Sequence, residues 1–192
     1  MRRSEVLRLI GFGLCLGGIT TPFAPGSVFA LGGPAPDLDQ PAPDFVLEAA
    51  GKTGALGQTL GLANFKGSWL LVYFFPRDFT SGCTLEAQGF QHDLAAFQAA
   101  EAAIIGISAD SAAEHARFCT SEGLNFPLLS DPGGRVSKLY GSWMAPFSLR
   151  HSFLIDPEGI LRARWLGVNP AGHSQDVLQT LQQLQSSPAS TL

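Results

Sequence analysis

Two uninterrupted apolar runs, separated by an amphipathic stretch, constrain the fold of this chain more than any other feature. Residues 69–75 (WLLVYFF) and 102–108 (AAIIGIS) carry no charged side chain. Such runs are typical of strands that other elements cover on both faces. The stretch between them predicts a helix, because its apolar residues recur at helical spacing: Ala87, Phe90, Leu94 and Phe97. A strand, a helix and a strand in this order predict parallel strands in one sheet.

The remaining elements extend this alternation. The sequence SAAE at residues 111–114 is a capping box that opens a second helix, and Gly123 closes that helix. We expect a short edge strand at 45–49 and another strand at 127–131. Residues 152–167 predict two strands joined by the turn DPEG, and a C-terminal helix follows them. The prediction is an α/β protein, a three-layer α/β/α sandwich with a mixed central sheet. The thioredoxin fold is one such arrangement.

The charge distribution argues against nucleic acid as a partner. The 192-residue chain has a formal net charge of −4 and no block of lysine or arginine. Its four histidines show no metal-ligand spacing, and we expect His115 on a helix surface and His173 at a helix start. No glycine pattern suits a nucleotide. We therefore expect no metal site and no nucleotide site.

The N-terminal residues have the layout of a secretory signal peptide. Three arginines and one glutamate in the first eight residues precede an uncharged apolar stretch, and Val28 and Ala30 occupy the small-residue positions of a cleavage site. We therefore expect residues 1–30 to be a signal peptide, with an uncleaved membrane anchor as the alternative. The rest divides into a Pro/Gly/Asp linker at 31–40, a folded domain at 41–187 and a disordered tail at 188–192.

Cys83, in the stretch FFPRDFTSGCTLEA, is the candidate reactive residue. A cysteine at this place is a buried small hydrophobe, half of a structural disulfide, or a nucleophile. It occupies the first turn of the predicted helix, where backbone N–H groups and the helix dipole favour a thiolate. It also follows the carboxyl end of a buried strand, where open α/β sheets bind ligands. Thr80 lies three residues upstream, within reach of the sulfur. These features favour the nucleophile.

The pattern Pro76-x-x-x-Thr80-x-x-Cys83 resembles the active-site signature of the peroxiredoxins. The wider sequence PRDFTSGCTLEAQGF resembles the bacterioferritin comigratory protein/peroxiredoxin Q subfamily. Three further segments resemble that subfamily in order and spacing: APDF at 42–45, FPLLSD at 126–131 and RHSFLID at 150–156. The likeness extends from about residue 41 to 184. It implies a thioredoxin fold and cysteine-dependent reduction of a peroxide, without a metal or an organic cofactor.

The resemblance also implies a role for each matching residue. Cys83 matches the peroxidatic cysteine, Thr80 the hydroxyl that hydrogen-bonds the peroxide, and Arg150 the arginine beside the thiolate. Pro76 matches the residue that shields the pocket, and Glu86 a glutamate usual in the subfamily. Each has a structural alternative. These are helix capping for Thr80, first-turn charge placement for Glu86, strand termination for Pro76 and a solvated charge for Arg150.

The resolving cysteine is where the chain departs from many subfamily members. They carry it five residues after the peroxidatic cysteine, and Gln88 occupies that position here. One alternative is an enzyme whose sulfenic acid is reduced by an external thiol. The other is resolution by Cys119, 36 residues after Cys83 at an interval that resembles other members; Cys119 also suits a core position. We expect Cys119 to resolve the sulfenic acid of Cys83. Since the two cysteines lie on separate predicted helices, we expect both helices to unwind in part before a disulfide forms.

The expected reaction defines the expected partners. They are a peroxide, hydrogen peroxide or an organic hydroperoxide, and thioredoxin or a thioredoxin-like reductant. The resemblance favours a monomer. Export implies the periplasm, or the thylakoid lumen if the source is photosynthetic. A thioredoxin-like disulfide reductase is excluded because Cys83 has no partner in a C-x-x-C motif. A non-catalytic exported binding module with a structural Cys83–Cys119 bridge remains the rival.

Overall fold

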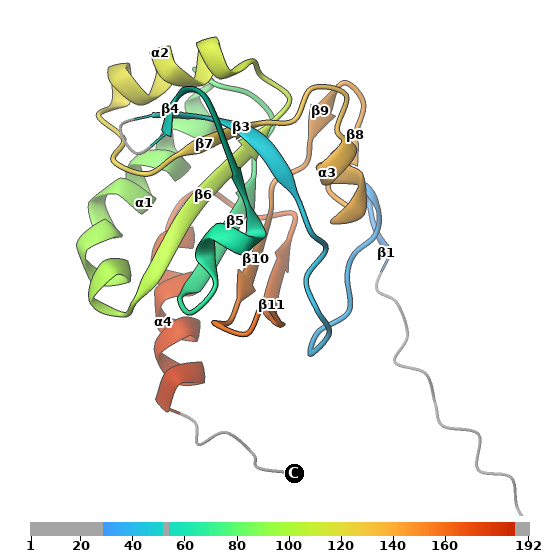
Figure 1. Ribbon diagram of the computed structural model, residues 1–192, viewed down its shortest axis with the longest axis vertical. Coiled ribbons are helices and arrows are strands. Elements are labelled where there is room, and N and C mark those ends of the chain that lie inside the picture. Colours follow the sequence, from blue (N-terminus) through green and yellow to red (C-terminus); the bar gives the residue numbers. More distant parts are fainter. Residues whose placement is uncertain (1–28, 52–53, 187–192) are drawn as a thin grey trace, which may run out of the picture.

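The computed structural model describes residues 29–51 and 54–186, which form a mixed sheet with helices on both faces (Figure 1). The largest sheet has seven strands. In spatial order they are β11 (Leu161–Leu166), β10 (His151–Ile155), β5 (Trp69–Phe74), β6 (Ala102–Ser108), β7 (Leu128–Ser130), β3 (Val46–Gly51) and β4 (Gly54–Gly61). Strands β5, β6 and β7 are parallel, and every other pair in this sheet is antiparallel. The predicted mixed sheet is confirmed.

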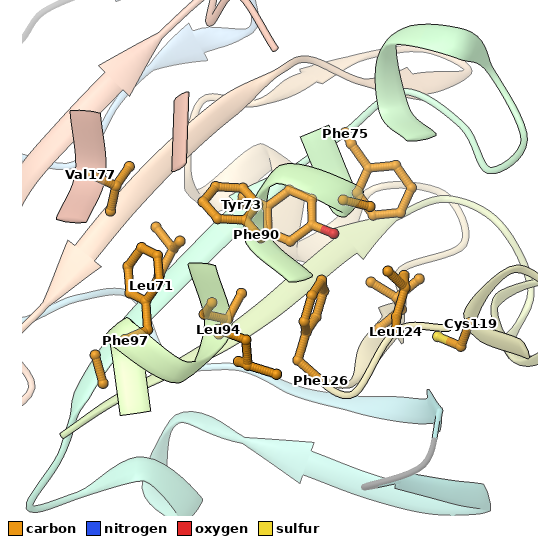
Figure 2. Close-up of a cluster of buried hydrophobic side chains, with 14 of the residues drawn as sticks. Leu71, Tyr73, Phe75, Phe90, Leu94, Phe97, Cys119, Leu124, Phe126 and Val177 are labelled. Carbon is orange, nitrogen blue, oxygen red and sulfur yellow. The ribbon is translucent and has the colours of Figure 1, made fainter. Parts of the chain in front are cut away.

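The helices cover the sheet on two sides (Figure 1). They are α1 (Ser81–Ala99), α2 (Ala112–Glu122), α3 (Arg135–Leu139) and α4 (His173–Ser186), with a 3-10 turn, η1, at Leu62–Phe65. Side chains of α1, α2 and α4 share one apolar cluster with Leu71 and Tyr73 of β5, part of which Figure 2 shows. The opposite face of β5, at Leu70 and Val72, belongs to a second cluster that includes Val136 of α3. Both faces of β5 are therefore buried, as its continuous apolar run predicts.

Local signals account for the helix boundaries. The apolar positions predicted for the first helix all lie buried on α1. Ser111 accepts a hydrogen bond from the backbone N–H of Glu114 and completes the expected capping box of α2. Gly123 ends that helix in the left-handed conformation, with φ of 65°. No helix within the described ranges is long and apolar enough to cross a bilayer.

The N-terminal side of the sheet differs from the prediction. The strand expected at a sheet edge is β3, and it lies between β7 and β4 instead. Strand β4 is the true edge, and it was not predicted because GALGQTLG lacks an alternation of apolar and polar residues. Its pairing with β3, from Val46–Gly61 to Gly51–Gly54, is a tertiary contact rather than a local preference.

Residues 33–44, most of which were expected to form a linker, lie along the folded domain. The backbone N–H of Asp39 donates to the Leu161 carbonyl at 2.8 Å, and Ala35 is buried. Strand β2 (Gly33–Pro34) pairs with β1 (Phe29–Ala30). The bond between Asp39 and Leu161 has a physical reason: β11 lies at the edge of the sheet, and its backbone groups on that side need partners. The predicted signal peptide up to residue 28 and the predicted tail lie outside the described residues. A further short ribbon consists of β8 (Trp143–Met144) and β9 (Phe147–Ser148).

Candidate active site

Cys83 lies in the first turn of α1, just beyond the carboxyl end of β5. Its side chain is buried and only 1% exposed. Arg150 directly precedes β10, and the register of β10 on β5 pairs His151 with Phe74. This antiparallel pairing places Arg150 beside the carboxyl end of β5, close to the start of α1. The guanidinium Nη2 then donates to the Cys83 sulfur at 3.3 Å.

Glu86 completes the charged group around the sulfur. It lies one helical turn after Cys83, is also buried, and accepts a hydrogen bond from Arg150 Nη1 through Oε2. Burial raises the pKa of Glu86 to about 7, although the Arg150 guanidinium opposes that rise. Burial favours a lower pKa for Arg150, but Glu86 and Cys83 outweigh it and raise the pKa. A permanent cation therefore bridges the sulfur and a carboxylate that changes protonation near neutral pH.

Thr80 is the N-cap residue of α1, but its side chain does not cap the helix. Its hydroxyl donates to the Arg77 carbonyl at 3.0 Å, and the residue is exposed at the mouth of the first turn. Because that donation uses the hydroxyl proton, the oxygen lone pairs are free to accept a hydrogen bond from a bound O–H group. Pro76 is half-buried between β5 and this turn.

Gly82 is a further member of the site that the sequence reasoning missed. A Cβ atom at this position would lie 3.2 Å from Arg150 Nη2 and 3.8 Å from Pro170 Cγ. The missing side chain leaves space for the guanidinium beside the sulfur. The small residues before the cysteine, in SGC, are the only trace of this requirement in the sequence.

Cys119 has different surroundings. It is a free thiol on α2, 4% exposed, and lies at the edge of the apolar cluster in Figure 2. A Cβ atom at Gly51 of β3 would lie 3.3 Å from its sulfur. Burial, and secondly the charge of Asp78, raise the pKa of Cys119 to about 12. In this conformation Cys119 is a protonated thiol, and the two cysteines are not bonded to each other.

His115 corrects one prediction. It was expected on a helix surface, but its side chain is fully buried and its Nδ1 lies 2.8 Å from Asp78 Oδ2. Apolar neighbours such as Phe75, whose ring lies 5.9 Å away, turn this face of α2 inward. The hydrogen bond from His115 opposes the rise in the pKa of Asp78 that burial causes.

Asp78, Asp110 and His115 also form the one group with metal-ligand geometry among the described residues, with ligand atoms within 4.8 Å of one another. One potential ligand atom of each residue already has a hydrogen-bonding partner: His115 Nδ1, Asp78 Oδ2 and Asp110 Oδ2. His115 bonds Asp78, and Asp110 Oδ2 accepts from the Asp78 backbone and from the Ser108 hydroxyl, each at 2.8 Å. Hydrogen bonds therefore hold these three side chains together.

The site has a definite chemical capacity. A buried sulfur at a helix N-terminus, held by a guanidinium, is suited to attack an electrophilic oxygen and to release an anionic leaving group. Of the residues predicted for the site, the structure brings Cys83, Arg150 and Glu86 into one hydrogen-bonded group, with Thr80 at its mouth. Cys119 lies outside that group.

Comparison with known proteins agrees with this chemistry. The AhpC/TSA family matches residues 38–164. Peroxiredoxin Bcp of Bacillus subtilis is 34% identical over 156 residues, which are 77% of this chain and 96% of that protein.

Two solved structures from Xanthomonas campestris also match. Peroxiredoxin Q superposes with a TM-score of 0.67 at 33% identity and covers 72% of this chain and 90% of its own. The bacterioferritin comigratory protein gives a TM-score of 0.67 at 31% identity and covers 73% and 91%. The chain therefore belongs to the AhpC/TSA family, as a peroxiredoxin of the Bcp/peroxiredoxin Q subfamily, and is a thiol-dependent peroxidase.

Proposed function

We propose that Cys83 is the peroxidatic residue and that Cys119 resolves its oxidised form. The hydrogen bond from Arg150 Nη2 to the Cys83 sulfur is the observation that carries the proposal. The Cys83 thiolate attacks one peroxide oxygen, so that an S–O bond forms while the O–O bond breaks. The electron pair leaves with the second oxygen, which takes up a proton as water or an alcohol. Cys83 becomes a sulfenic acid.

Arg150 and Thr80 act on the transition state. A thiol of ordinary pKa, ~8.5, is roughly 3% ionised at pH 7, so ionisation alone increases the rate only about 30-fold. The larger contribution comes from aligning the peroxide with the sulfur and stabilising the charge on the departing oxygen. The Arg150 guanidinium supplies the charge. The Thr80 lone pairs, left free by the bond to Arg77, accept the peroxide O–H and orient it.

Resolution follows from the second thiol. The Cys119 sulfur, once deprotonated, attacks the Cys83 sulfur, so that an S–S bond forms, the S–O bond breaks and water leaves. A dithiol reductant, thioredoxin or a similar protein, then exchanges with this disulfide and restores both thiols. The high pKa of Cys119 and its burial require α2 to open first, which exposes the sulfur to water and lowers that pKa.

The substrates include organic hydroperoxides besides hydrogen peroxide. Phe79 and Leu85 flank Thr80 and Cys83 in the chain, and their apolar side chains are 54% and 50% exposed. Such side chains favour contact with the organic part of a hydroperoxide. The related Xanthomonas campestris bacterioferritin comigratory protein has alkyl peroxide reduction activity.

The protein acts as an exported monomer in this proposal. The N-terminal charge and apolar pattern support export, to the periplasm or to the thylakoid lumen of a photosynthetic source. Expression with residues 1–30 in a bacterial host, followed by fractionation, tests this. N-terminal sequencing that finds the intact Met1 in the cytosol would contradict it.

One equivalent of hydrogen peroxide added to the reduced protein tests both cysteines. We expect mass spectrometry to find a Cys83–Cys119 disulfide in the wild type and a sulfenic acid on Cys83 in Cys119→Ser. The matched Cys83→Ser variant controls for non-specific oxidation and should remain reduced. A sulfenic acid in the wild type with no disulfide would indicate a one-cysteine peroxidase served by an external thiol. An unmodified Cys83 would refute the catalytic assignment.

A further inference from the structure

We propose that the buried Asp78–His115 hydrogen bond is a latch that holds α2 closed over Cys119 and thereby sets the rate of resolution. The inference rests on the proposed resolving role of Cys119. It assigns a positioning function to two residues that have no part in the attack on peroxide. Both residues are buried. Their hydrogen bond to each other is separate from the bond between Arg150 and Glu86 at the Cys83 site.

The latch joins the two segments that carry the cysteines. Asp78 lies in the loop that leads into α1, five residues before Cys83, and His115 lies on α2, four residues before Cys119. The hydrogen bond between His115 Nδ1 and Asp78 Oδ2 is 2.8 Å long. Because residues four apart share a helical face, any movement of Cys119 out of the core also pulls on His115. The two sulfurs therefore cannot approach while this bond persists and α2 stays helical.

The latch is the one hydrogen bond between the side chains of Asp78 and His115, and the backbone N–H of Asp78 also donates to Asp110 Oδ2 at 2.8 Å. Asp78 Oδ1 and His115 Nε2 are buried without a hydrogen-bond partner among the described residues. Opening of the segment gives both atoms access to water, so the open form regains hydration that the closed form lacks. A buried pair of this kind holds the closed form in place, and it keeps the free-energy difference between the closed and open forms small.

Neighbouring contacts act in both directions. Phe79 packs edge-on against Phe118 of α2 at 5.1 Å, which favours the closed form. However, Phe79 has φ of 59°, a left-handed conformation that an aromatic residue adopts only under constraint. Opening the loop releases that constraint. On the surface, Gln88 of α1 also donates to Glu122 of α2 at 2.8 Å, but an exposed bond of this type contributes little.

A functional consequence follows from competition for the sulfenic acid. A second peroxide oxidises it to the sulfinic acid, while Cys119 converts it to the disulfide. The latch keeps the Cys83 site assembled for the first step, but it lengthens the life of the sulfenic acid. Stronger latching therefore makes the enzyme more sensitive to overoxidation at high peroxide concentration.

The test is a double-mutant cycle of Asp78→Ala, His115→Ala and the double variant. Quenched-flow alkylation and mass spectrometry would measure the rate at which Cys83 sulfenic acid becomes the disulfide. We expect each single variant to speed this step about tenfold, as loss of a hydrogen bond to a charged group implies, and the double variant to add less than twofold. Overoxidation at a fixed peroxide concentration should fall by a similar factor. His115→Asn, whose amide donor occupies the position of Nδ1, should return towards the wild-type rate.

Two control variants separate a latch from general loosening. Leu181→Ala removes a fully buried side chain from α4 and lowers global stability, while Gln88→Ala removes only the exposed bond between α1 and α2. Both should change the resolution rate less than twofold. Equal acceleration by Leu181→Ala, or unchanged rates in the Asp78 and His115 variants, would overturn the latch.

Hydrogen exchange in the Cys119→Ser background tests the latch without the disulfide. His115→Ala and Asp78→Ala should increase exchange in residues 115–121 about tenfold, while the peroxide reaction of Cys83 stays within twofold. Faster exchange combined with no disulfide in the wild type would disprove resolution by Cys119 and retain the latch as the control on α2 opening. Unchanged exchange would disprove the latch itself.

Discussion

Cys83 and Cys119 are both buried free thiols, yet their surroundings differ in the features that govern reactivity. Cys83 receives a hydrogen bond from a guanidinium, and a carboxylate one turn away holds that guanidinium in place. Cys119 lies among apolar side chains beneath Gly51, where burial raises its pKa to about 12. The first cysteine is prepared for reaction in the closed fold, and the second is kept unreactive there. Under the proposed resolution by Cys119, the fold separates oxidation from resolution by conformation.

Removal of the Arg150 guanidinium should have the largest effect on this contrast. We expect Arg150→Ala to lower the second-order rate of peroxide reaction by about 10²–10³, because a preorganised donor to the developing charge is lost. Competition with a reporter peroxidase measures that rate. Arg150→Lys keeps the charge but cannot donate to the sulfur and to the carboxylate at once as a guanidinium does, so its rate should lie between those of the wild type and Arg150→Ala. A loss of only a few-fold would mean that Cys83 does not depend on this charge.

Thr80→Val should also reduce the rate of peroxide attack by well over 30-fold, because the isosteric side chain cannot accept a hydrogen bond from the peroxide O–H. Thr80→Ser retains the hydroxyl and serves as the matched control. The same competition assay applies, and the rate of disulfide formation after oxidation should not change. Near-wild-type reactivity of Thr80→Val would limit Thr80 to the bond it makes with the Arg77 carbonyl.

Glu86 should make the Cys83 region sensitive to pH. Its pKa rises from the ordinary value of 4.5 to about 7 in the fold. The folded state therefore holds this proton more tightly than the unfolded state, and the free energy of unfolding falls as pH rises from about 4.5 to about 7. At ~1.36 kcal/mol per pKa unit the decrease is about 3 kcal/mol.

Urea unfolding of wild type and Glu86→Gln at several pH values isolates this contribution. The difference between the two proteins should change across pH 4.5–7, whereas groups common to both, such as His173, cancel. His173 acts with the opposite sign, since burial lowers its pKa to about 4 and stability is lost as pH falls below about 6.5. Parallel pH profiles would show that folding does not shift the pKa of Glu86.

Gly82→Ala should lower the rate of the first step about tenfold. The added methyl group would lie 3.2 Å from Arg150 Nη2, so the guanidinium must shift away from the sulfur. Stopped-flow oxidation in the Cys119→Ser background measures this step alone. The matched control is Gly89→Ala, further along the same helix, where the added atom meets Ser174 instead. Equal rates in Gly82→Ala and wild type would show that the guanidinium position is not critical.

Gly51→Ala is the corresponding substitution on the Cys119 side and should have the smallest effect. Gly51 has φ of 117°, and a Cβ there would lie 3.3 Å from the Cys119 sulfur. We expect a loss of about 1 kcal/mol in unfolding free energy and a several-fold faster resolution, because the added methyl group strains the closed position of Cys119. Peroxide attack on Cys83 should be unaffected. A slower first step would contradict the separation of the two regions.

Prediction from sequence succeeded where the signal is local. The apolar run of β5, the spacing of apolar residues in α1 and the capping box at Ser111 each describe a neighbourhood along the chain, and each element is present. It failed for β4, and it did not predict how residues 33–40 pair. Their structure depends on backbone pairing with β3 and with the edge of β11, which no local pattern encodes.

The candidate site divides in the same way. Cys83 and Thr80 could be found from their place between a buried strand and a helix, since that junction is visible in the sequence. Arg150 was reached only through the family resemblance, because nothing local connects it with a cysteine 67 residues earlier. His115 was misplaced because a single polar residue on a short helix gives no information about which face is buried.

The fold class, the candidate reactive cysteine and the lack of a cysteine at the position of Gln88 could all be read from the sequence alone. These properties depend on the kinds of residue present and on their spacing over one or two elements. Two contacts became visible only in the folded molecule: Gly82 makes room for Arg150, and Asp78 holds His115 beside the second cysteine. Those contacts depend on strand register and on the packing of helices distant in sequence, where one residue of shift would separate the partners.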